Sequence, residues 1–369
     1  MRGKVLILGG YGNFGSRIAL ALVKKRIPII IAGRNKLKAS QLCDELNVKY
    51  PESHTEFAIF DIHAGFDEQL KKIQPDIVIN TCGPFQNSDY SIAESCIQHK
   101  IHYIDLADAR DFVVGISSLN EKAKKNDVLI VSGASTVPGL SSAVLEHYKK
   151  NFSEIDSLIY GISPGQQAPR GLATTQSILT YLGKPLKLAP GNSQEQYGWQ
   201  DLYRQYYPVL GKRWMANGDI PDLDLFSKRY GIKSMRFSAG MENVLLHFSM
   251  WAVSWLVRLG LPINLTKHAA KLLQISTLFD GFGSADGGMH MLMKGKSYQG
   301  ESIEIQWFVI AKDGDGPQIP CVPAIVLAQK LIAGQIQTRG AVPCVAMVNL
   351  EEYMKELKEY SIKEFVKQI

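Results

Sequence analysis

Short uninterrupted apolar runs alternate with segments of helical periodicity over the first 150 residues. Such runs are typical of parallel strands buried on both faces, because these strands have no solvent-facing side to carry polar residues. Between the runs, apolar residues return at helical spacing, as Leu37, Leu42 and Leu46 do. The alternation predicts an α/β domain with a doubly wound parallel sheet over residues 1–150. The expected strands are residues 4–8, 28–32, 56–60, 77–80, 101–104 and 128–131.

The pattern changes after residue 151, where Gly and Pro interrupt it more often. This change predicts a second, α+β domain over residues 151–318 that serves substrate binding or dimerisation. Within it, residues 189–217 form an irregular segment rich in Tyr and Trp, which fits core aromatics, a lid or a dimer surface. The expected strands, the last two of them antiparallel neighbours, are residues 157–162, 234–239, 288–294 and 302–311.

Residues 319–369 are expected to return to the first domain and to pack on it as helices. A very apolar helix is predicted over residues 323–333, and a terminal amphipathic one over residues 350–357. Earlier in the chain, Ser118 and Glu121 have the spacing of a capping box at the start of a surface helix.

One segment, residues 244–261, is almost entirely apolar. His247 and Arg258 are its only charged or titratable residues, and it includes Trp251 and Trp255. A bilayer span needs about 20 consecutive apolar residues, so this segment is short and interrupted for that purpose. A buried helix is the favoured interpretation, while an interfacial helix that meets a membrane surface or a partner, and a span, stay open.

A glycine-rich turn with the spacing GxGxxG follows the first expected strand and precedes a predicted helix. We interpret Gly10 as the sharp turn, Gly12 as the point where a pyrophosphate approaches the backbone, and Gly15 as the contact between helix and strand. The N–H groups at this helix start, in the segment that includes Asn13 and Phe14, would face the phosphates. The turn therefore predicts a dinucleotide-binding domain of the Rossmann type.

The end of the second strand indicates which dinucleotide is bound, because NAD-binding domains usually place an acidic residue there. This chain has Arg34 and Asn35 instead. Arg34 can pair with a 2′-phosphate or stack beside the adenine, so we expect NADP(H) as the cofactor, with Asn35 in the same turn. Asp61, which closes the third strand, either bonds the adenine amino group or caps the following turn.

The segment Cys82-Gly83-Pro84 leaves the fourth strand at the edge where ligands lie in such folds. Gly83 and Pro84 are expected to form a backbone wall for the nicotinamide ribose. Cys82 is either a small packing residue or a nucleophile, and the absence of a nearby His in the sequence favours packing.

Four segments together resemble the saccharopine dehydrogenase-like oxidoreductases, namely residues 9–15, 32–35, 80–85 and 103–108. The resemblance covers residues 1–140 well, and residues 323–343 are similar to the closing segment of that family. It implies nicotinamide-dependent hydride transfer, which the saccharopine enzymes carry out at the C–N bond of an amino-acid conjugate. Saccharopine reductases carry Asp-Pro-Gly after the sixth strand, whereas this chain has Val137-Pro138-Gly139, so the resemblance does not extend to saccharopine as the substrate.

Hydride transfer also needs an acid or base for the proton on nitrogen or oxygen. No Tyr in this sequence has a Lys four residues on, which excludes the YxxxK mechanism of short-chain reductases. HExxH and P-loop patterns are missing too. The expected proton carriers are Tyr103, Asp105 and Asp108, with Arg110 and His102 as weaker candidates near the same sheet edge. Tyr103 and Asp105 share one face of the fifth strand.

The composition limits the kinds of molecule that this protein is expected to bind. The formal net charge of +6 is small for 369 residues, and no run of Lys and Arg exceeds three, which argues against nucleic-acid binding. Five scattered Cys residues without a CxxC pair fit a reducing, cytoplasmic setting and predict neither a zinc site nor a disulfide framework. We expect a small-molecule substrate and no metal, and a homodimer is a family-based expectation.

Three functions remain open from the sequence. The favoured one is an NADP(H)-dependent oxidoreductase acting on a C=N, C=O or C=C group. The second is a catalytically silent NADP-binding sensor or scaffold, which the Val137 departure favours. The third is a membrane-surface protein anchored through residues 244–261.

Overall fold

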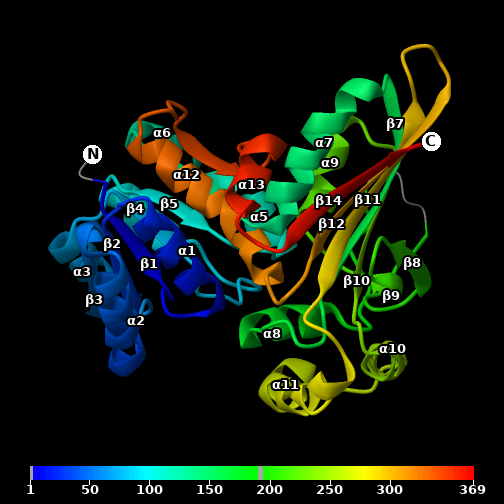
Figure 1. Cartoon of the computed structure of the whole chain (residues 1–369), viewed down its shortest axis with the longest axis horizontal. Helices are drawn as coiled ribbons and strands as arrows, with labels where there is room; N and C mark the ends of the chain where they lie inside the picture. Colours follow the sequence, from blue (N-terminus) through cyan, green and yellow to red (C-terminus); the bar gives the residue numbers. More distant parts are fainter. Residues whose placement is uncertain (1–2, 190–193) are drawn as a thin grey trace. The chain divides into compact units, whose positions relative to one another are not determined.

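The computed structural model describes residues 3–189 and 194–369 and divides the chain into two units (Figure 1). The first unit runs to Ala143 and takes up the chain again over Gln318–Glu356. The second contains Val144–Pro317 and Leu357–Ile369. Among the described residues, each unit contains a seven-stranded sheet.

The sheet of the first unit is parallel, with the strand order β13-β6-β5-β4-β1-β2-β3. Val5 of β1 lies between Ile29 and Ile77 of the neighbouring strands, so the order reverses between β1 and β4, where ligands bind in doubly wound sheets. The strands are β1 (Val5–Leu8), β2 (Ile29–Gly33), β3 (Thr55–Ile59), β4 (Ile77–Asn80), β5 (His102–Asp105), β6 (Leu129–Ser132) and β13 (Gly340–Pro343).

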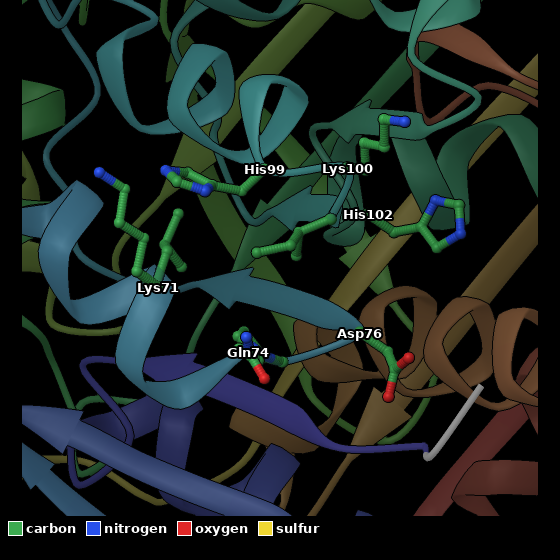
Figure 2. Close-up of a pocket in the computed structure, with 9 residues that line it drawn as sticks. Lys71, Gln74, Asp76, His99, Lys100 and His102 are labelled. Carbon is green, nitrogen blue, oxygen red and sulfur yellow. The ribbon is translucent and has the colours of Figure 1, made fainter.

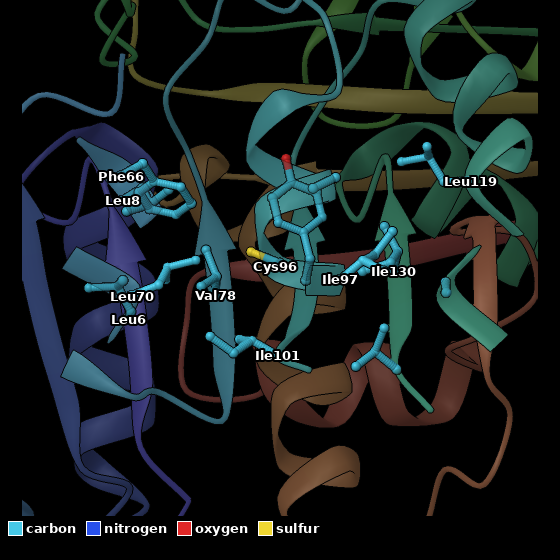
Figure 3. Close-up of a cluster of buried hydrophobic side chains, with 14 of the residues drawn as sticks. Leu6, Leu8, Phe66, Leu70, Val78, Cys96, Ile97, Ile101, Leu119 and Ile130 are labelled. Atoms are coloured by element: carbon cyan, nitrogen blue, oxygen red, sulfur yellow. The ribbon is translucent and has the colours of Figure 1, made fainter. Parts of the chain in front are cut away.

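One face of this sheet carries the hydrophobic core drawn in Figure 3. Alternate strand residues such as Leu6, Val78 and Ile130 point to it, and helices α3, α4 and α6 cover it with residues such as Leu70 and Ile97. Burial on both faces explains why these strands read as uninterrupted apolar runs. The helices along this part of the chain are α1 (Asn13–Lys24), α2 (Lys36–Lys49), α3 (Phe66–Ile73), α4 (Ser91–Gln98), α5 (Arg110–Gly115), α6 (Asn120–Lys125), α7 (Ser141–Tyr148), α12 (Val322–Ile332) and α13 (Leu350–Leu357).

The sheet of the second unit is mixed, in the order β14-β12-β11-β7-β10-β9-β8. The β7–β10 pair is parallel and the other described pairs are antiparallel, including the expected neighbours β11 and β12. Its strands are β7 (Glu154–Ser163), β8 (Tyr203–Tyr207), β9 (Gly211–Asn217), β10 (Ser234–Gly240), β11 (Gly287–Lys296), β12 (Ser302–Ala311) and β14 (Ile362–Gln368). Its helices are α8 (Leu172–Tyr181), α9 (Asp222–Tyr230), α10 (Val244–Arg258) and α11 (Ala269–Thr277).

The predicted fold class is confirmed: a doubly wound parallel sheet with a second α+β domain and a C-terminal segment that returns to the first sheet. The C-terminal segment was predicted to pack on the first sheet as helices, but residues 340–343 also join that sheet as β13, a seventh parallel strand beside β6. The prediction for the end of the chain was wrong. The chain leaves the first unit after Glu356, and Ile362–Gln368 pairs with β12 in the second sheet instead of packing as a helix on the first.

Two local predictions, for residues 189–217 and for the capping box, also differ from the structure. The segment 189–217 is not irregular throughout, because β8 and β9 form an antiparallel hairpin in it; residues 190–193 of that prediction lie outside the described residues. The capping box does not form, since Ser118 lies inside a 3-10 turn (Ile116–Leu119) and α6 begins only at Asn120, without a side-chain cap.

The apolar segment 244–261 forms a helix, α10, but the buried-helix interpretation was wrong. Only His247 and Ser254 of this helix are fully buried, while Leu245 and Leu256 are exposed. Among the described residues, no helix is both long enough and apolar enough to cross a membrane.

Candidate functional site

The glycine turn after β1 is shaped by close backbone contacts. Gly9 has a positive φ of 70°, so the left-handed residue is Gly9, one position before the residue to which the sequence assigned the sharp turn. A side chain at Gly15 would place its Cβ 2.3 Å from the Gly9 carbonyl oxygen, which is impossible without moving the backbone. Gly10 is likewise pressed against β1, since a Cβ there would lie 2.9 Å from the Ile7 carbonyl oxygen. The turn therefore brings the start of α1 directly against the end of β1.

The N-terminus of α1 carries unusual charge for a helix start. Gly12 is its N-cap and supplies no side-chain hydrogen bond, and no acidic residue stands in the first turn. Instead the Arg17 guanidinium donates to the Asn13 carbonyl oxygen and to Asn13 Oδ1, the latter at 2.7 Å. A helix N-terminus is the positive end of the helix dipole, so a cation placed there raises the local positive potential. Such an end is suited to an anionic group such as a pyrophosphate.

The end of β2 lies beside this turn. Tyr11, inside the glycine turn, accepts a hydrogen bond from the Asn35 backbone N–H at 2.8 Å, and its ring fills the space that a Cβ on Gly33 would need. Asn35 caps α2, with its side chain accepting from Lys38 N at 3.0 Å. The Arg34 side chain is 80% exposed. Its contact with the Asp61 carboxylate is long, at 3.9 Å, so the guanidinium is available to a ligand.

Asp61 makes the turn-capping contact, which is one of the two roles that the sequence left open. Its Oδ1 accepts from the His63 backbone N–H at 3.0 Å, which caps the turn after β3. Its Oδ2 lies 3.9 Å from the Arg34 guanidinium, which is too long for a hydrogen bond.

The loop after β4 joins the same edge of the sheet. Thr81 Oγ1 donates to the Leu8 carbonyl oxygen at 2.8 Å, which ties the loop to the end of β1. Cys82 follows, and its backbone N–H donates to Asn80 Oδ1. Burial raises the pKa of the Cys82 thiol to about 11, and the nearby Arg34 charge only partly opposes this rise. Cys82 is therefore a neutral packing residue at physiological pH. The Gly83–Pro84 peptide that follows is cis.

Two of the three predicted proton carriers are buried. Asp105 Oδ1 accepts from Ser132 Oγ at 2.9 Å and from the backbone N–H groups of Gly133 and Ala107, at 2.8 Å and 3.0 Å. Burial raises the pKa of the Asp105 carboxyl to about 6, and these hydrogen bonds limit the rise. Tyr103, whose hydroxyl accepts from Asn80 Nδ2 at 3.1 Å, is also buried, and burial raises its pKa well above the ordinary value. Both residues link β5 to its neighbours.

Asp108 lies in the loop after β5 and is only partly buried. Its Oδ1 accepts from Gln86 Nε2 at 3.2 Å, which connects this loop to the loop after β4. The two weaker candidates are buried: Arg110 begins α5, and His102 Nδ1 accepts from the Leu129 backbone N–H at 2.9 Å. Burial lowers the pKa of His102, so this side chain is a neutral structural contact.

Two cavities lie at opposite edges of the first sheet. The one at the carboxyl ends of the strands has a volume of about 280 Å³, and Asn80, Cys82 and Tyr103 are among its lining residues. The other, of about 340 Å³, lies before the first residues of β4 and β5, between Lys71, Asp76 and Lys100 (Figure 2). Ligands of doubly wound sheets bind at the carboxyl edge, so the first cavity belongs to the candidate site.

The glycine turn, Arg34, Asp61 and the loop after β4 thus meet at the carboxyl edge, at the point where the strand order reverses. Residues 5–131 match the sequence model of the saccharopine dehydrogenase NADP-binding domain. This part of the chain is therefore similar to the NADP-binding domain of the saccharopine dehydrogenases. A comparison with curated protein sequences finds no significant match.

This chain is also similar to solved structures of dehydrogenases. The apo, histidine-tagged saccharopine dehydrogenase (L-Glu forming) from Saccharomyces cerevisiae matches over 100% of both chains, at 11% identity and a TM-score of 0.65. A dehydrogenase from Chromobacterium violaceum matches 84% of this chain and 75% of that chain, at 10% identity and a TM-score of 0.38. Serine dehydrogenase from Escherichia coli matches 35% of this chain and 80% of that chain, at 14% identity and a TM-score of 0.27. The first of these shows that this chain shares the saccharopine dehydrogenase fold.

At residue 137, where this sequence differs from the saccharopine reductases, the side chain is apolar. Val137, at the position of their Asp, is buried in the turn between β6 and α7. No carboxylate is available at this position of the saccharopine dehydrogenase-like domain to hold a substrate ammonium.

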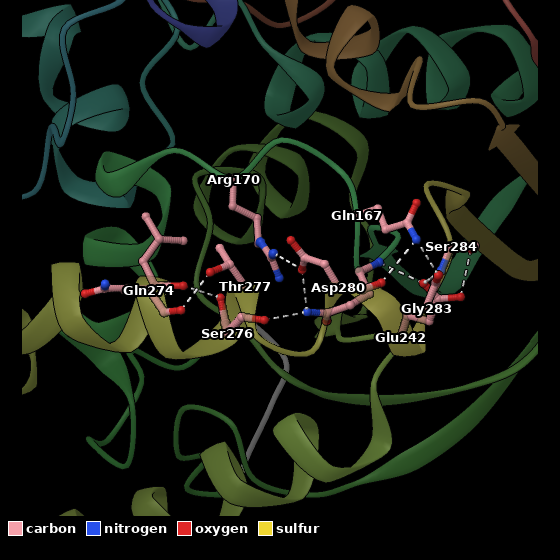
Figure 4. Close-up of polar contacts among 11 residues, drawn as sticks. Gln167, Arg170, Glu242, Gln274, Ser276, Thr277, Asp280, Gly283 and Ser284 are labelled. Atoms are coloured by element: carbon pink, nitrogen blue, oxygen red, sulfur yellow. Dashed lines mark hydrogen bonds and ion pairs between the residues drawn. The ribbon is translucent and has the colours of Figure 1, made fainter.

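The arginines of the second unit are engaged with their own neighbours. Arg213 is only 7% exposed and pairs with Glu242 at 3.0 Å, and Arg170 pairs with Asp280 (Figure 4). Arg204 stacks on Trp214, with 4.6 Å from its guanidinium carbon to the ring centre. These contacts hold the segments of the second unit together.

Three residues of the site were missed in the sequence, namely Tyr11, Arg17 and Thr81. Tyr11 and Arg17 stand in and just after the glycine turn, and an aromatic and a cation at those places are visible signals. Thr81 carried no signal, because its bond to Leu8 joins residues far apart in the sequence.

Proposed function

We propose that this chain is an NADP(H)-dependent oxidoreductase that transfers a hydride to or from a C=N, C=O or C=C group of a small substrate. The match of residues 5–131 to an NADP-binding domain and the fold shared with a saccharopine dehydrogenase support this proposal. The observation that carries the choice of cofactor is Arg34. It is exposed at the end of β2, beside the glycine turn, and no acidic residue stands at that strand end.

The residues present fit such a cofactor. The start of α1, with no side-chain cap and with Arg17 nearby, would hold the pyrophosphate. Arg34 would pair with the 2′-phosphate, because a guanidinium presents several N–H donors to phosphate oxygens. The Cys82-Gly83-Pro84 segment would lie against the nicotinamide ribose. When bound, the cofactor supplies or accepts the hydride, and the protein positions its reactive carbon.

The proton would move through Asp108. Among the three carboxyl and phenol groups expected from the sequence, Asp108 is the one that is not fully buried. Its bond to Gln86 orients its carboxylate between the loops after β4 and β5. Tyr103 and Asp105 would act as positioning residues that keep those loops in place.

Cofactor titration of Arg34→Glu tests the proposal. The variant should weaken NADPH binding about 100-fold or more, because it replaces an attractive charge by a repulsive one, and NADH binding by only a few fold. Arg26→Glu is the matched control. It makes the same charge change on a 77% exposed arginine just after the C-terminal end of α1, and it should leave both affinities unchanged. Equal losses for NADPH and NADH would contradict pairing of Arg34 with the 2′-phosphate.

Gly12→Val tests whether the glycine turn binds the pyrophosphate. A Cβ at Gly12 would lie 3.0 Å from the Gly9 carbonyl oxygen, so small shifts allow the fold, while the valine methyl groups block the approach of the pyrophosphate. Binding of both cofactors should be lost with the circular dichroism spectrum retained. Unchanged affinity would remove the cofactor site from this turn.

A second function is a catalytically silent NADP-binding protein. It is favoured by the burial of Tyr103 and Asp105 and by the apolar Val137, which leave Asp108 as the one predicted proton carrier of the three that is not fully buried. Turnover of NADPH with panels of imines, ketones and enoyl compounds separates the two. Turnover that falls about 100-fold in Asp108→Asn supports the enzyme, whereas tight NADPH binding without turnover on any panel supports the silent protein.

A further inference from the structure

The second unit exposes several large apolar side chains on α10, in the turn after α10 and just after α11. We name this set the α10–α11 surface and define it by its six clearest members, Leu245, Leu256, Leu259, Leu261, Leu278 and Phe282. Leu259 is 75% exposed, Leu278 74% and Phe282 78%. Single exposed leucines are ordinary on protein surfaces, but a row of exposed apolar residues along one face of a helix, as on α10, marks an interaction site.

The outward side of α10 is apolar along its whole length. Residues 245, 249, 252, 256 and 259 are exposed and follow one another by three or four positions, which places them on one helix face. The single polar member, Ser249, donates its hydroxyl to the Leu245 carbonyl oxygen at 2.8 Å. This bond satisfies the hydroxyl within the helix, so the face offers no charge that needs water.

The inward side of α10 is already packed. Trp251 and Val253 lie against the buried cluster around Leu179, Leu182 and Trp199. Trp199 Nε1 donates to the His247 carbonyl oxygen at 3.2 Å, and Asn243 caps the helix. The helix is therefore held without any cover on its outward side, and the exposed face is free to meet another surface.

The segment that carries most of this surface has charge of one sign, and Asp280, beside Phe282, is paired with Arg170. From Asn243 to Phe279 the chain contains no Asp or Glu, while it contains Arg258, Lys267 and Lys271, all exposed. A segment that is apolar with basic residues at its margins is complementary to an interface with hydrocarbon below and anionic groups above. A second copy of the same surface is a poorer partner, because a twofold contact would bring these cations together without acidic residues to pair them.

We propose that the α10–α11 surface docks on an anionic lipid membrane without crossing it. In this arrangement Leu259 and Leu261, in the uncharged turn after α10, enter the acyl region, and Lys267 and Lys271 lie among the headgroups. The chain is then a protein that works at the membrane surface, where apolar substrates collect. The proposal does not depend on hydride transfer.

Flotation of the full-length protein with vesicles is the test. Vesicles of phosphatidylcholine with about 30 mol % phosphatidylserine should carry the protein, about tenfold more strongly than phosphatidylcholine alone, and about 1 M salt should reduce this preference. The double variant Leu259→Glu/Leu261→Glu should bind at least about tenfold more weakly, since it replaces two inserted side chains by two charges.

The control is Val48→Glu/Tyr298→Glu, which adds the same two charges at side chains that are 84% and 71% exposed outside the α10–α11 surface. It should float like the unmodified protein. Melting temperature and NADPH affinity, measured on all three proteins, show whether each variant is folded. Absence of binding to anionic vesicles, or equal binding by the two double variants, overturns the proposal. A stable dimer that the Leu259/Leu261 variant converts to monomer, with no vesicle binding, overturns it in favour of self-association.

Discussion

The two sheets of this protein are of equal size among the described residues, yet they differ in how their sequences encode them. The inner strands of the parallel sheet are buried on both faces, and β1, β2, β4 and β6 are accordingly mostly apolar. In the mixed sheet, β8 and β14 lie at the edges; β8 alternates buried and exposed residues, and β14 is mostly exposed. Uninterrupted apolar runs were easy to recognise in the sequence, and these partly exposed edge strands were not.

The polar residues of the two units also differ in arrangement. In the first unit, Arg34 and the start of α1 are turned outward at one sheet edge. In the second, Arg213 and Glu242 are turned inward and satisfy each other. Glu242 also accepts from the backbone N–H groups of Gln166 and Ser284, and together these contacts lower its pKa despite its burial. One unit keeps its polar groups available for a ligand, and the other uses them for its own stability.

Replacing one arginine in each unit should separate these roles most strongly. Arg213→Met leaves the Glu242 carboxylate without its ion-pair partner in a mostly buried site, so unfolding should become easier by about 3–5 kcal/mol. NADPH affinity, measured well below the lowered melting temperature, should be unchanged. The exposed Arg34→Glu should show the opposite pattern, lost NADPH affinity with a stability change within about 0.5 kcal/mol. If Arg213→Met weakened NADPH binding in the folded protein, the proposed division of roles would be wrong.

The buried Asp105 gives the first unit a pH dependence of intermediate size. Its pKa is about 6 in the folded protein and 3.8 is the ordinary value, so the folded state holds this proton more tightly than the unfolded state. The contribution of Asp105 is therefore most favourable below about pH 4 and is lost as the pH rises through 6, a change of about 3 kcal/mol. Asp105→Asn does not titrate and keeps an oxygen that can accept from Gly133.

Urea unfolding of both proteins between pH 4 and 8 measures this effect. The stability of the unmodified protein relative to Asp105→Asn should fall across pH 4 to 6 and then level off. Parallel curves over the whole range would show that Asp105 does not titrate in this way.

The smallest expected effect compares the two asparagine caps. Asn35 caps α2 in the first unit and Asn243 caps α10 in the second, each through a side-chain oxygen at 3.0 Å or 3.1 Å from a backbone nitrogen. Replacing either by Ala should cost about 1 kcal/mol of stability. Only Asn35→Ala should also weaken NADPH binding, because Asn35 follows Arg34 in the same turn. A similar loss of affinity in Asn243→Ala would contradict the assignment of the cofactor to the first unit.

The position of the candidate site could be predicted from the sequence, but the roles of its individual residues could not. Arg34 and Gly15 stand next to strands that the sequence shows clearly, and the structure brings both to the edge where the strand order reverses. Asp105 was placed at the right strand end, but its orientation depends on donors from Ser132 and Gly133, far along the chain. A carboxylate at a strand end points to solvent or to a neighbouring turn according to such distant donors.

The sequence by itself determined the parallel sheet, the glycine turn and the basic residue at the end of β2, because each depends on local pattern and short spacing. Only the tertiary structure decided that Asp105 and Tyr103 are buried, that β14 joins the second sheet, and that α10 keeps one apolar face exposed. An apolar helix looks the same in sequence whether one side or both are covered. Coverage is set by the elements that pack against it, and these come from distant parts of the chain.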